Sequence, residues 1–278
     1  MLKKSVILNA IIFFAAVGAL CQAQSQSQSA AQPWPQAQND ASLKLEFDVA
    51  TVKPSPPNEQ SAGIKPLPGG QTYVATGVPV RLMIRLMFHL TPNQISGGPS
   101  WLDSDLYDVT AKADRPRNID ELHIMFQNLL IDRFKLQFHT DTKEMSAYTL
   151  AVDKSGSKIT PNTGPEPFDI PYSGVGFGKL KFTHVSMSYF TWFLAGFPPI
   201  GRPVVDGTDL KGFYDFTLEW APELPPGVDP EVVAKLPPTN GLDIFAAIQK
   251  ELGLKLEPGK AQVAVMVIDH AEKPTDDN

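Results

Sequence analysis

The sequence contains a single cysteine, Cys21, among 278 residues. This scarcity excludes a disulfide-stapled scaffold and a zinc site built on several cysteine thiolates. Basic residues are also few. The net charge is −6 and no Lys/Arg cluster is present to neutralise phosphates, which excludes a nucleic-acid-binding surface. Beyond the amino terminus, no apolar run reaches the roughly twenty residues of a membrane-spanning helix, so the fold must rely on an apolar core.

Proline is the residue type in excess, with 26 copies. Hydrophobic residues make up 42% of the chain and charged residues 19%, which is ordinary for a folded protein. The prolines therefore indicate many rigid loops rather than collagen or general disorder. The length suits one large domain or two small ones.

The amino terminus has the pattern of a cleavable secretory signal. Two lysines precede an apolar run of about fifteen residues, too short to cross a bilayer, and Ala23 is a suitable cleavage position. An uncleaved anchor and a lipoprotein attached through Cys21 are the alternatives, and the bulky Leu20 disfavours lipidation. We expect residues 1–23 to be removed and the protein to work in the periplasm or outside the cell.

The rest of the chain divides by composition. Residues 24–42 are mostly Gln, Ser, Ala and Pro, and we expect them to form a disordered tether because they have too little apolar surface to fold. A first folded unit, a linker, a second folded unit and a tail are then expected at 43–160, 161–178, 179–272 and 273–278.

Strand and helix patterns alternate in the first unit. Asn118 and Glu121 have the spacing of a capping box and mark the start of its second helix. The expected elements are a strand from Leu45 that Pro54 ends, a strand at 72–74, a helix from Pro79, a strand at 107–112, a helix ending near Arg133, and two closing strands at 135–140 and 148–153.

The second unit repeats this order. Its expected elements are a strand at 180–183, a helix capped by Ser186, strands at 205–206 and 214–220, a helix capped by Asn240, and strands at 254–257 and 263–269. Gly253 stands where a left-handed helix cap belongs. The sequence thus predicts an α+β fold of two similar β-α-β-α-β-β units, each small enough to need a shared interface with the other.

A short motif supports the repeat. At one constant offset, the residues Tyr107, Asp108 and Thr110 match Tyr214, Asp215 and Thr217. The order of elements and the loop chemistry match at the same offset. Because both aspartates open equivalent strands, we expect each to make the same structural bond in its own unit.

Residues able to carry chemistry are scattered. The histidines are His89, His123, His139, His184 and His270. None is spaced with another for metal binding on one helix, so we expect surface histidines, no metal and no other cofactor. Asp103 and Asp105 are either calcium ligands or, as we favour, acceptors of backbone amides in a turn. Ser155 and Lys158 have a catalytic spacing, but the glycine between them indicates a hairpin tip.

Four aromatic residues crowd one short segment: Phe190, Trp192, Phe193 and Phe197. They exceed what one helix face needs for packing. They belong either to the core and the interface between the units or to an exposed contact patch.

The segment from Val204 to Leu218 resembles the strand-turn-strand of the short amino-terminal domain of secretins and TonB-dependent receptors. The likeness covers roughly Leu180 to Asp269, with a looser echo in the first unit. It departs from that pattern at the proline-rich insertion before the last helix. The resemblance implies a domain that binds protein partners.

Five segments carry a second resemblance, which spans the chain from the first strand to the carboxyl end. They are FDVATVKP at 47–54, ISGGPSW at 95–101, DRFKL at 132–136, D-x-T-x-L-x-G-x-YDF at 206–216 and VIDH at 267–270. In these segments the chain resembles an uncharacterised secreted family, expanded in soil acidobacteria, that carries a domain of unknown function. The resemblance implies an envelope or extracellular location and supplies no activity.

Together these patterns predict an exported, non-catalytic binding or adaptor module of the cell envelope. Its partner would be a protein that adds a strand to an exposed sheet edge. The alternative is a secreted hydrolase with a site between the two units. Two acidic groups and a histidine within hydrogen-bond reach there would favour the hydrolase, and a solid core between the units would favour binding.

Overall fold

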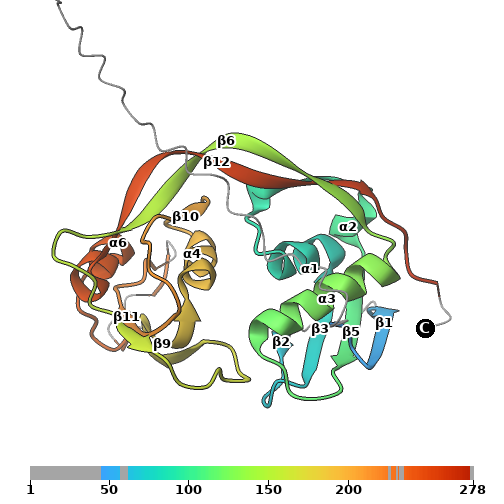
Figure 1. Ribbon diagram of the computed structural model, residues 1–278, viewed down its shortest axis with the longest axis horizontal. Helices are drawn as coiled ribbons and strands as arrows, with labels where there is room; N and C mark the ends of the chain where they lie inside the picture. Colours follow the sequence, from blue (N-terminus) through green and yellow to red (C-terminus); the bar gives the residue numbers. More distant parts are fainter. Residues whose placement is uncertain (1–44, 57–61, 225–226, 230, 232–234, 276–278) are drawn as a thin grey trace, which may run out of the picture.

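Two long antiparallel strands run over the top of the whole molecule (Figure 1). The computed structural model describes residues 45–56, 62–224, 227–229, 231 and 235–275. The expected signal peptide and tether lie outside these residues. The two long strands are β6 (Gln137–Val152) and β12 (Leu254–His270), and we call the pair the ribbon.

Each ribbon strand is continuous. The predicted division of the first into strands at 135–140 and 148–153, and of the second into strands at 254–257 and 263–269, is therefore wrong. The polar middle section of each strand stays extended because the partner strand satisfies its backbone hydrogen bonds along the whole length. Across this section Lys260 Nζ donates to Glu144 at 2.7 Å. Pairing, rather than local apolar alternation, therefore sets the length of these strands.

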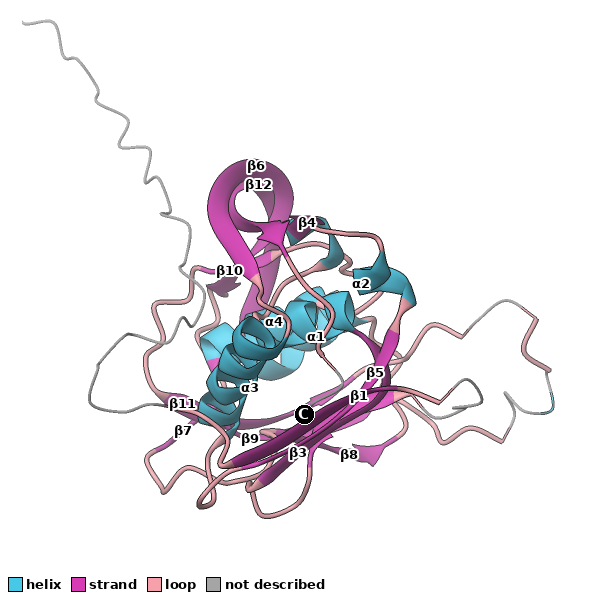
Figure 2. Cartoon of the chain, turned by 90° about the vertical axis from the view of Figure 1, so that its right-hand side faces the viewer, coloured by secondary structure: helices cyan, strands magenta, loops and turns pink. Residues whose placement is uncertain are grey.

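The first half of the chain forms a four-stranded antiparallel sheet with two helices. The sheet order is β1 (Val49–Pro54), β5 (Leu106–Lys112), β3 (Thr72–Pro79), β2 (Gly63–Pro66). Helices α1 (Val80–Met87) and α3 (Ile119–Arg133) lie between this sheet and the ribbon (Figure 2). The first strand begins later than predicted, because Phe47 turns inward and packs edge-on against Phe126 of α3 at 6.3 Å.

The second half forms a sheet of the same kind. Its order is β7 (Thr160–Asn162), β11 (Phe213–Glu219), β9 (Lys179–Ser186), β8 (Tyr172–Gly176). The predicted linker 161–178 is therefore wrong as a linker, since it supplies β8 and most of β7. The helices are α4 (Met187–Ala195), α6 (Ile244–Ala247) and the π-helical turn η2 (Ile248–Leu252).

Two short strands exchange partners between the halves. β4 (Ile95–Gly97) belongs to the first half but pairs parallel with β12 of the second. β10 (Val204–Asp206) belongs to the second half but pairs parallel with β6 of the first. The short elements η1 (Pro92–Gln94) and α2 (Trp101–Ser104) flank β4. Neither half therefore completes its hydrogen bonding without the other.

The repeat extends to irregularities of the backbone. The β3–β5 ladder is interrupted by a bulge between Ala75 and Val78, and the β9–β11 ladder is interrupted between Tyr214 and Phe216. Gly77 and His184 occupy equivalent places in these bulges with positive φ angles of 61° and 52°. The α+β class predicted from the sequence is confirmed.

Helix boundaries follow local capping chemistry. The capping box of Asn118 and Glu121 is confirmed at the start of α3, as are the Ser186 cap of α4 and the left-handed Gly253 that ends η2. The predicted Asn240 cap is wrong. Asp243 caps α6 by accepting from Ala246 N at 2.7 Å, while Asn240 Nδ2 donates to Glu219 O and Glu251.

The apolar core spans both halves. Among its largest fully buried side chains are Phe88, Phe126, Phe134, Phe182 and Phe190. Helices α1 and α4 lie on the facing sides of the two halves beneath the ribbon (Figure 1). Within the described ranges, no helix combines the length and the apolar character that crossing a membrane requires.

Candidate functional site

A cavity of about 290 Å³ lies where the two halves meet. The first half contributes His89 and Gln94 from the chain after α1, and Asp120 from the first turn of α3. The second half contributes Tyr189 and Trp192 from α4, together with residues of β10 and β12. We call it the central cavity. Because both halves line it, it exists only when they are assembled.

A chain of hydrogen bonds leads from the first-half core to this cavity. Tyr73 Oη lies 3.2 Å from His123 Nε2, and His123 Nδ1 lies 2.8 Å from His89 Nε2. His123 bonds Tyr73 through one ring nitrogen and His89 through the other. Which atom donates in the bond between the two imidazoles depends on their tautomers. His89 has a φ angle of 55°, a conformation that costs a non-glycine residue about 1–2 kcal/mol.

Burial keeps both imidazoles uncharged at neutral pH. It lowers the pKa of His89 to about 4. It also lowers the pKa of His123 well below the usual value, and the neighbouring His89 lowers it further. At the cavity wall, His89 therefore takes part in hydrogen bonding as a neutral group and carries no positive charge.

Stacked rings connect the two halves at the cavity wall. His89 stacks on Trp192 with ring centroids 4.3 Å apart and an interplanar angle of 17°. Tyr189 packs edge-on against both rings, at 5.9 Å from His89 and 5.1 Å from Trp192. Such ring pairs contribute about 0.5–1.5 kcal/mol each beyond their area burial. The cluster fixes one wall of the central cavity.

Asp120 is the carboxyl group of the central cavity. Burial raises its pKa to about 6, and the negative charge of Glu166 contributes to the rise. Among the described residues, its carboxylate has no hydrogen-bond or ion-pair partner. It also makes no contact with His89 or His123, so the described residues do not form an acid–histidine pair here.

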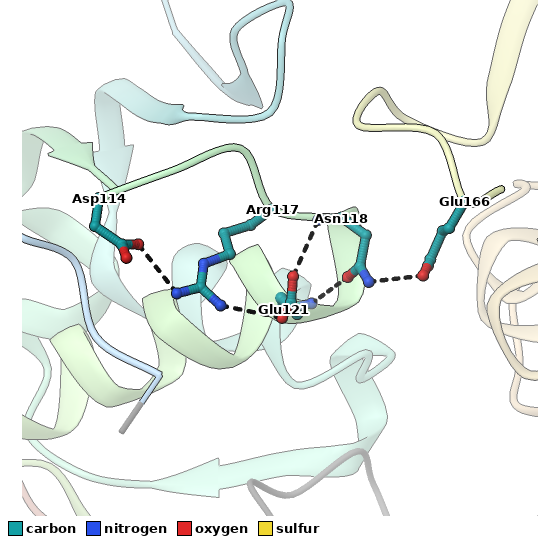
Figure 3. Close-up of polar contacts among 5 residues, drawn as sticks. All are labelled: Asp114, Arg117, Asn118, Glu121 and Glu166. Carbon is teal, nitrogen blue, oxygen red and sulfur yellow. Dashed lines mark hydrogen bonds and ion pairs between the residues drawn. The ribbon is translucent and has the colours of Figure 1, made fainter. Parts of the chain in front are cut away.

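A polar clip joins the two halves at the start of α3 (Figure 3). Asn118 Nδ2 donates to Glu166 Oε2 at 2.7 Å, which ties the loop before β8 to the start of α3. On the same helix end, Arg117 donates to Glu121 at 3.2 Å and to Asp114 at 3.0 Å. Together the clip and the ribbon hold the halves on both sides of the central cavity.

A second cavity, of about 420 Å³, adjoins the first. Its walls are mainly apolar side chains of α1 and α4 and the chain that follows each, including Leu86, Leu90, Phe193 and Phe197. Trp192 and Ala195 line both cavities. Trp192 therefore lies between the central cavity, whose lining includes several polar groups, and a more apolar cavity.

The repeat motif lies away from both cavities. Tyr107 and Tyr214 are buried in β5 and β11, at 3% and 7% exposure, while Thr110 and Thr217 point to solvent. Asp108 accepts from Gly77 N at 2.8 Å, and Asp215 accepts from His184 N at 2.8 Å. The motif thus serves the two bulges and contributes nothing to the cavity walls.

The four aromatic residues of α4 and the turn after it do not form one surface patch. Phe190 is 0% exposed and belongs to the core, so its place in a contact patch is wrong. Phe193 packs on Tyr172 at 4.8 Å, and Phe197 packs on Trp220 at 5.3 Å. These side chains pack against different neighbours because α4 has the sheet of its own half on one side and the first half on the other. Of the four, Trp192 reaches the central cavity.

The expectation of surface histidines is wrong for three of the five. His123 and His184 are buried, and His89 is half-buried, because each packs against an aromatic ring. His139 and His270 are exposed and contact Asp269 and Glu272. No group of three or more His, Cys, Asp or Glu side chains in the described ranges is placed to hold a metal ion.

The acidic residues around α2 pair with cations. Asp103 accepts from Arg81 at 2.8 Å and Asp105 contacts Lys273 Nζ at 2.6 Å, so their expected bonds to backbone amides are wrong. Sequence reasoning also missed Asp120 and the pairing of His89 with His123. The capping box placed Asp120 in a first helical turn, but no local pattern showed that this turn faces a cavity.

The fold and the site define a two-repeat α+β protein with a ligand-sized cavity between its repeats. The family model described as protein of unknown function (DUF3738) matches residues 81–271, and the chain belongs to this family. No curated protein matches the chain, and neither does any solved structure. Function therefore has to be argued from the cavity itself.

Proposed function

We propose that this protein is an exported, non-catalytic binding protein of the cell envelope whose ligand occupies the central cavity. The observation that carries the proposal is the cavity's place between the repeats, with polar groups from both halves converging on one space. Clefts between structural units, with a few placed polar groups among apolar walls, are the usual sites for small ligands. The signal-like pattern expected at the amino terminus and the two resemblances stated from the sequence support the proposed location.

The hydroxyl groups of the cavity support binding rather than catalysis. Ser188 Oγ lies 3.0 Å from Ser186 Oγ, and Thr191 Oγ1 donates to the Ser188 carbonyl at 3.0 Å. Thr91 Oγ1 donates to Gln94 at 2.8 Å. An activated nucleophile needs a hydrogen bond to a base, and in the described residues these hydroxyls contact neither a histidine nor a carboxylate.

The sheet edges favour the cavity over strand addition as the binding surface. The edge strands β1, β2 and β7 contain Pro54, Pro66 and Pro161. Proline cannot donate a ladder hydrogen bond, and edge prolines are a common protection against pairing with other chains. The predicted partner strand therefore meets an interrupted ladder at three of the four outer edges of the two half-sheets.

A screen with a matched pair of variants tests the proposal. Ala195→Leu adds bulk to both cavities, whereas Ala62→Leu adds the same bulk at an exposed position. We expect small molecules detected by ligand-observed NMR to bind the wild type and Ala62→Leu and to lose binding to Ala195→Leu. Equal binding to all three proteins, or no binding from a diverse polar library, would contradict the proposal.

The alternative function is a hydrolase with its site in the same cavity. The Tyr73–His123–His89 chain favours it, because it could relay a proton to the cavity wall. Turnover of small chromogenic esters or amides by the wild type, abolished in His89→Gln and retained in His139→Gln, would favour the hydrolase over the binding protein.

A further inference from the structure

The central cavity contains one carboxylate and no cationic side chain in its lining. The lining includes Asp120 and neither lysine nor arginine. His89, the basic residue of the lining, is uncharged at neutral pH because burial lowers its pKa to about 4. Within the described residues, Asp120 also accepts no hydrogen bond. A ligand that carries a positive charge into the cavity would therefore meet a carboxylate that has no cationic partner in the lining.

The guanidinium group at the start of α3 is paired with other carboxylates. Arg117, whose side chain is 9% exposed, donates through one terminal nitrogen to Asp114 and through the other to Glu121 (Figure 3). Glu166 receives the neutral amide of Asn118. The guanidinium group thus pairs with two of the carboxylates near the start of α3 and, in the described residues, not with Asp120, which is the carboxylate that faces the cavity.

This arrangement is costly for the empty protein. Burial and the charge of Glu166 both oppose ionisation of Asp120, and they raise its pKa to about 6. The carboxyl group is nevertheless largely ionised at pH 7. A positive charge placed in the cavity would attract the ionised form, and this attraction would offset the cost.

The aromatic wall suits the same kind of ligand. Burial raises the Tyr189 pKa well above its usual value, and Tyr172, Tyr73 and the negative charge of Asp120 raise it further. The phenol of Tyr189 therefore stays neutral at neutral pH. Tyr189 and Trp192 both line the cavity, and aromatic rings attract ammonium groups, particularly where water is scarce.

We propose that the central cavity binds a small organic cation, a primary amine or quaternary ammonium compound, with Asp120 as its counter-ion and the rings of Tyr189 and Trp192 against its alkyl groups. The inference rests on the proposed binding function and adds the chemical class of the ligand. The apolar cavity beyond Trp192 limits the charged end of the ligand to the Asp120 side.

Matched pairs of compounds test the charge requirement. Choline and 3,3-dimethylbutan-1-ol have nearly the same shape and differ in charge, as do benzylamine and benzyl alcohol at neutral pH. Binding is measured by titration calorimetry and by NMR shifts of the Trp192 indole N–H and the Ala195 amide, which report on the cavity. We expect at least one cation to bind tenfold or more tightly than its neutral partner.

Two variants of the same helix complete the test. Asp120→Asn removes the charge in the cavity, and Asp132→Asn removes one from the exposed last turn of α3, where the side chain is 70% exposed. We expect the preference for cations to disappear in Asp120→Asn and to persist in Asp132→Asn. Circular dichroism confirms that both variants are folded.

The outcomes separate the two proposals. If neutral or anionic compounds bind the cavity as well as the cations do, or if Asp120→Asn keeps the preference, the cation proposal is overturned and the binding function stands. If no compound of any charge shifts the cavity resonances, both proposals fail. Equal loss of the preference in both variants would assign it to the general field of the protein and also overturn the Asp120 site.

Discussion

Asp108 in the first half and Asp215 in the second accept the same backbone hydrogen bond, each at 2.8 Å, from the residue of positive φ in the facing bulge. Each carboxylate also accepts a side-chain bond from the outer strand or its end. Ser55 supplies it in the first half at 2.6 Å, and Asn162 supplies it in the second at 2.8 Å. The two halves thus stabilise one backbone irregularity with one device.

This equivalence gives a first prediction. Asp108→Ala and Asp215→Ala each leave a backbone N–H and a side-chain donor without their acceptor, and we expect each to lower the free energy of unfolding by about 2 kcal/mol. Urea denaturation followed by fluorescence measures the effect. Asp141→Ala is the control, because that exposed carboxylate accepts only from its neighbour Thr142 in the described residues. A large loss in one half alone would contradict the equivalence.

A pair of glycines separates backbone strain from steric conflict. Gly253 and Gly212 both have positive φ, at 65° and 85°. A Cβ atom at Gly253 would lie 2.0 Å from the Gly156 carbonyl oxygen, whereas one at Gly212 would meet nothing within 4 Å. We expect Gly212→Ala to cost about 1 kcal/mol from strain, and Gly253→Ala to cost more than about 3 kcal/mol. Similar denaturation midpoints for the two variants would refute this account.

The raised pKa of Asp120 predicts a pH-dependent gain from its removal. The unfolded chain ionises this carboxyl group near pH 3.9, and the folded protein does so near pH 6, so ionisation costs folding stability that develops as the pH rises between these values. We expect Asp120→Asn to be more stable than the wild type by about 2 kcal/mol at pH 7.5 and equally stable below pH 4. Asp132→Asn should show no such change with pH.

The lowered pKa of His89 predicts that stability changes with pH in the opposite direction. The unfolded chain protonates His89 near pH 6.5, whereas the folded protein does so only near pH 4, so the stability associated with the neutral form is lost as the pH falls through this window. We expect the wild type to lose about 3 kcal/mol relative to His89→Gln between pH 7 and pH 4. The exposed His139→Gln is the control, and a constant wild-type-minus-variant difference would contradict the prediction. Asp120 titrates in the same pH window. The test therefore uses the difference in unfolding free energy between the wild type and His89→Gln, and not the wild-type value alone.

The exchanged strands predict that the halves do not fold separately. A fragment of residues 45–158 keeps β6 but lacks β12, so a 16-residue strand loses its main partner, and β4 loses its own. Unpaired strand edges of this length associate with other chains. We expect the fragment to be unfolded or oligomeric by light scattering, and to recover a monomeric 1:1 complex with near-ultraviolet dichroism when mixed with 159–275. A folded monomeric fragment would refute the prediction.

Much of the local structure could be predicted from the sequence because it depends on short-range chemistry. The capping box of Asn118 and Glu121, the Ser186 cap and the left-handed Gly253 each involve residues within one turn of one another. The repeat was visible for a similar reason, since equivalent elements need equivalent side chains at equivalent offsets. The unity of each ribbon strand was not visible, because its polar middle is held by pairing with a strand more than a hundred residues away.

The amino-acid sequence by itself determined the α+β class, the two repeats and most of the helix ends, since hydrophobic periodicity and capping act over a few residues. The tertiary structure decided that the halves exchange strands, that His89 meets His123, and that Asp120 faces a cavity. Those relationships join residues far apart in the chain, and they arise only when the whole chain folds and packs together. No local pattern records that packing.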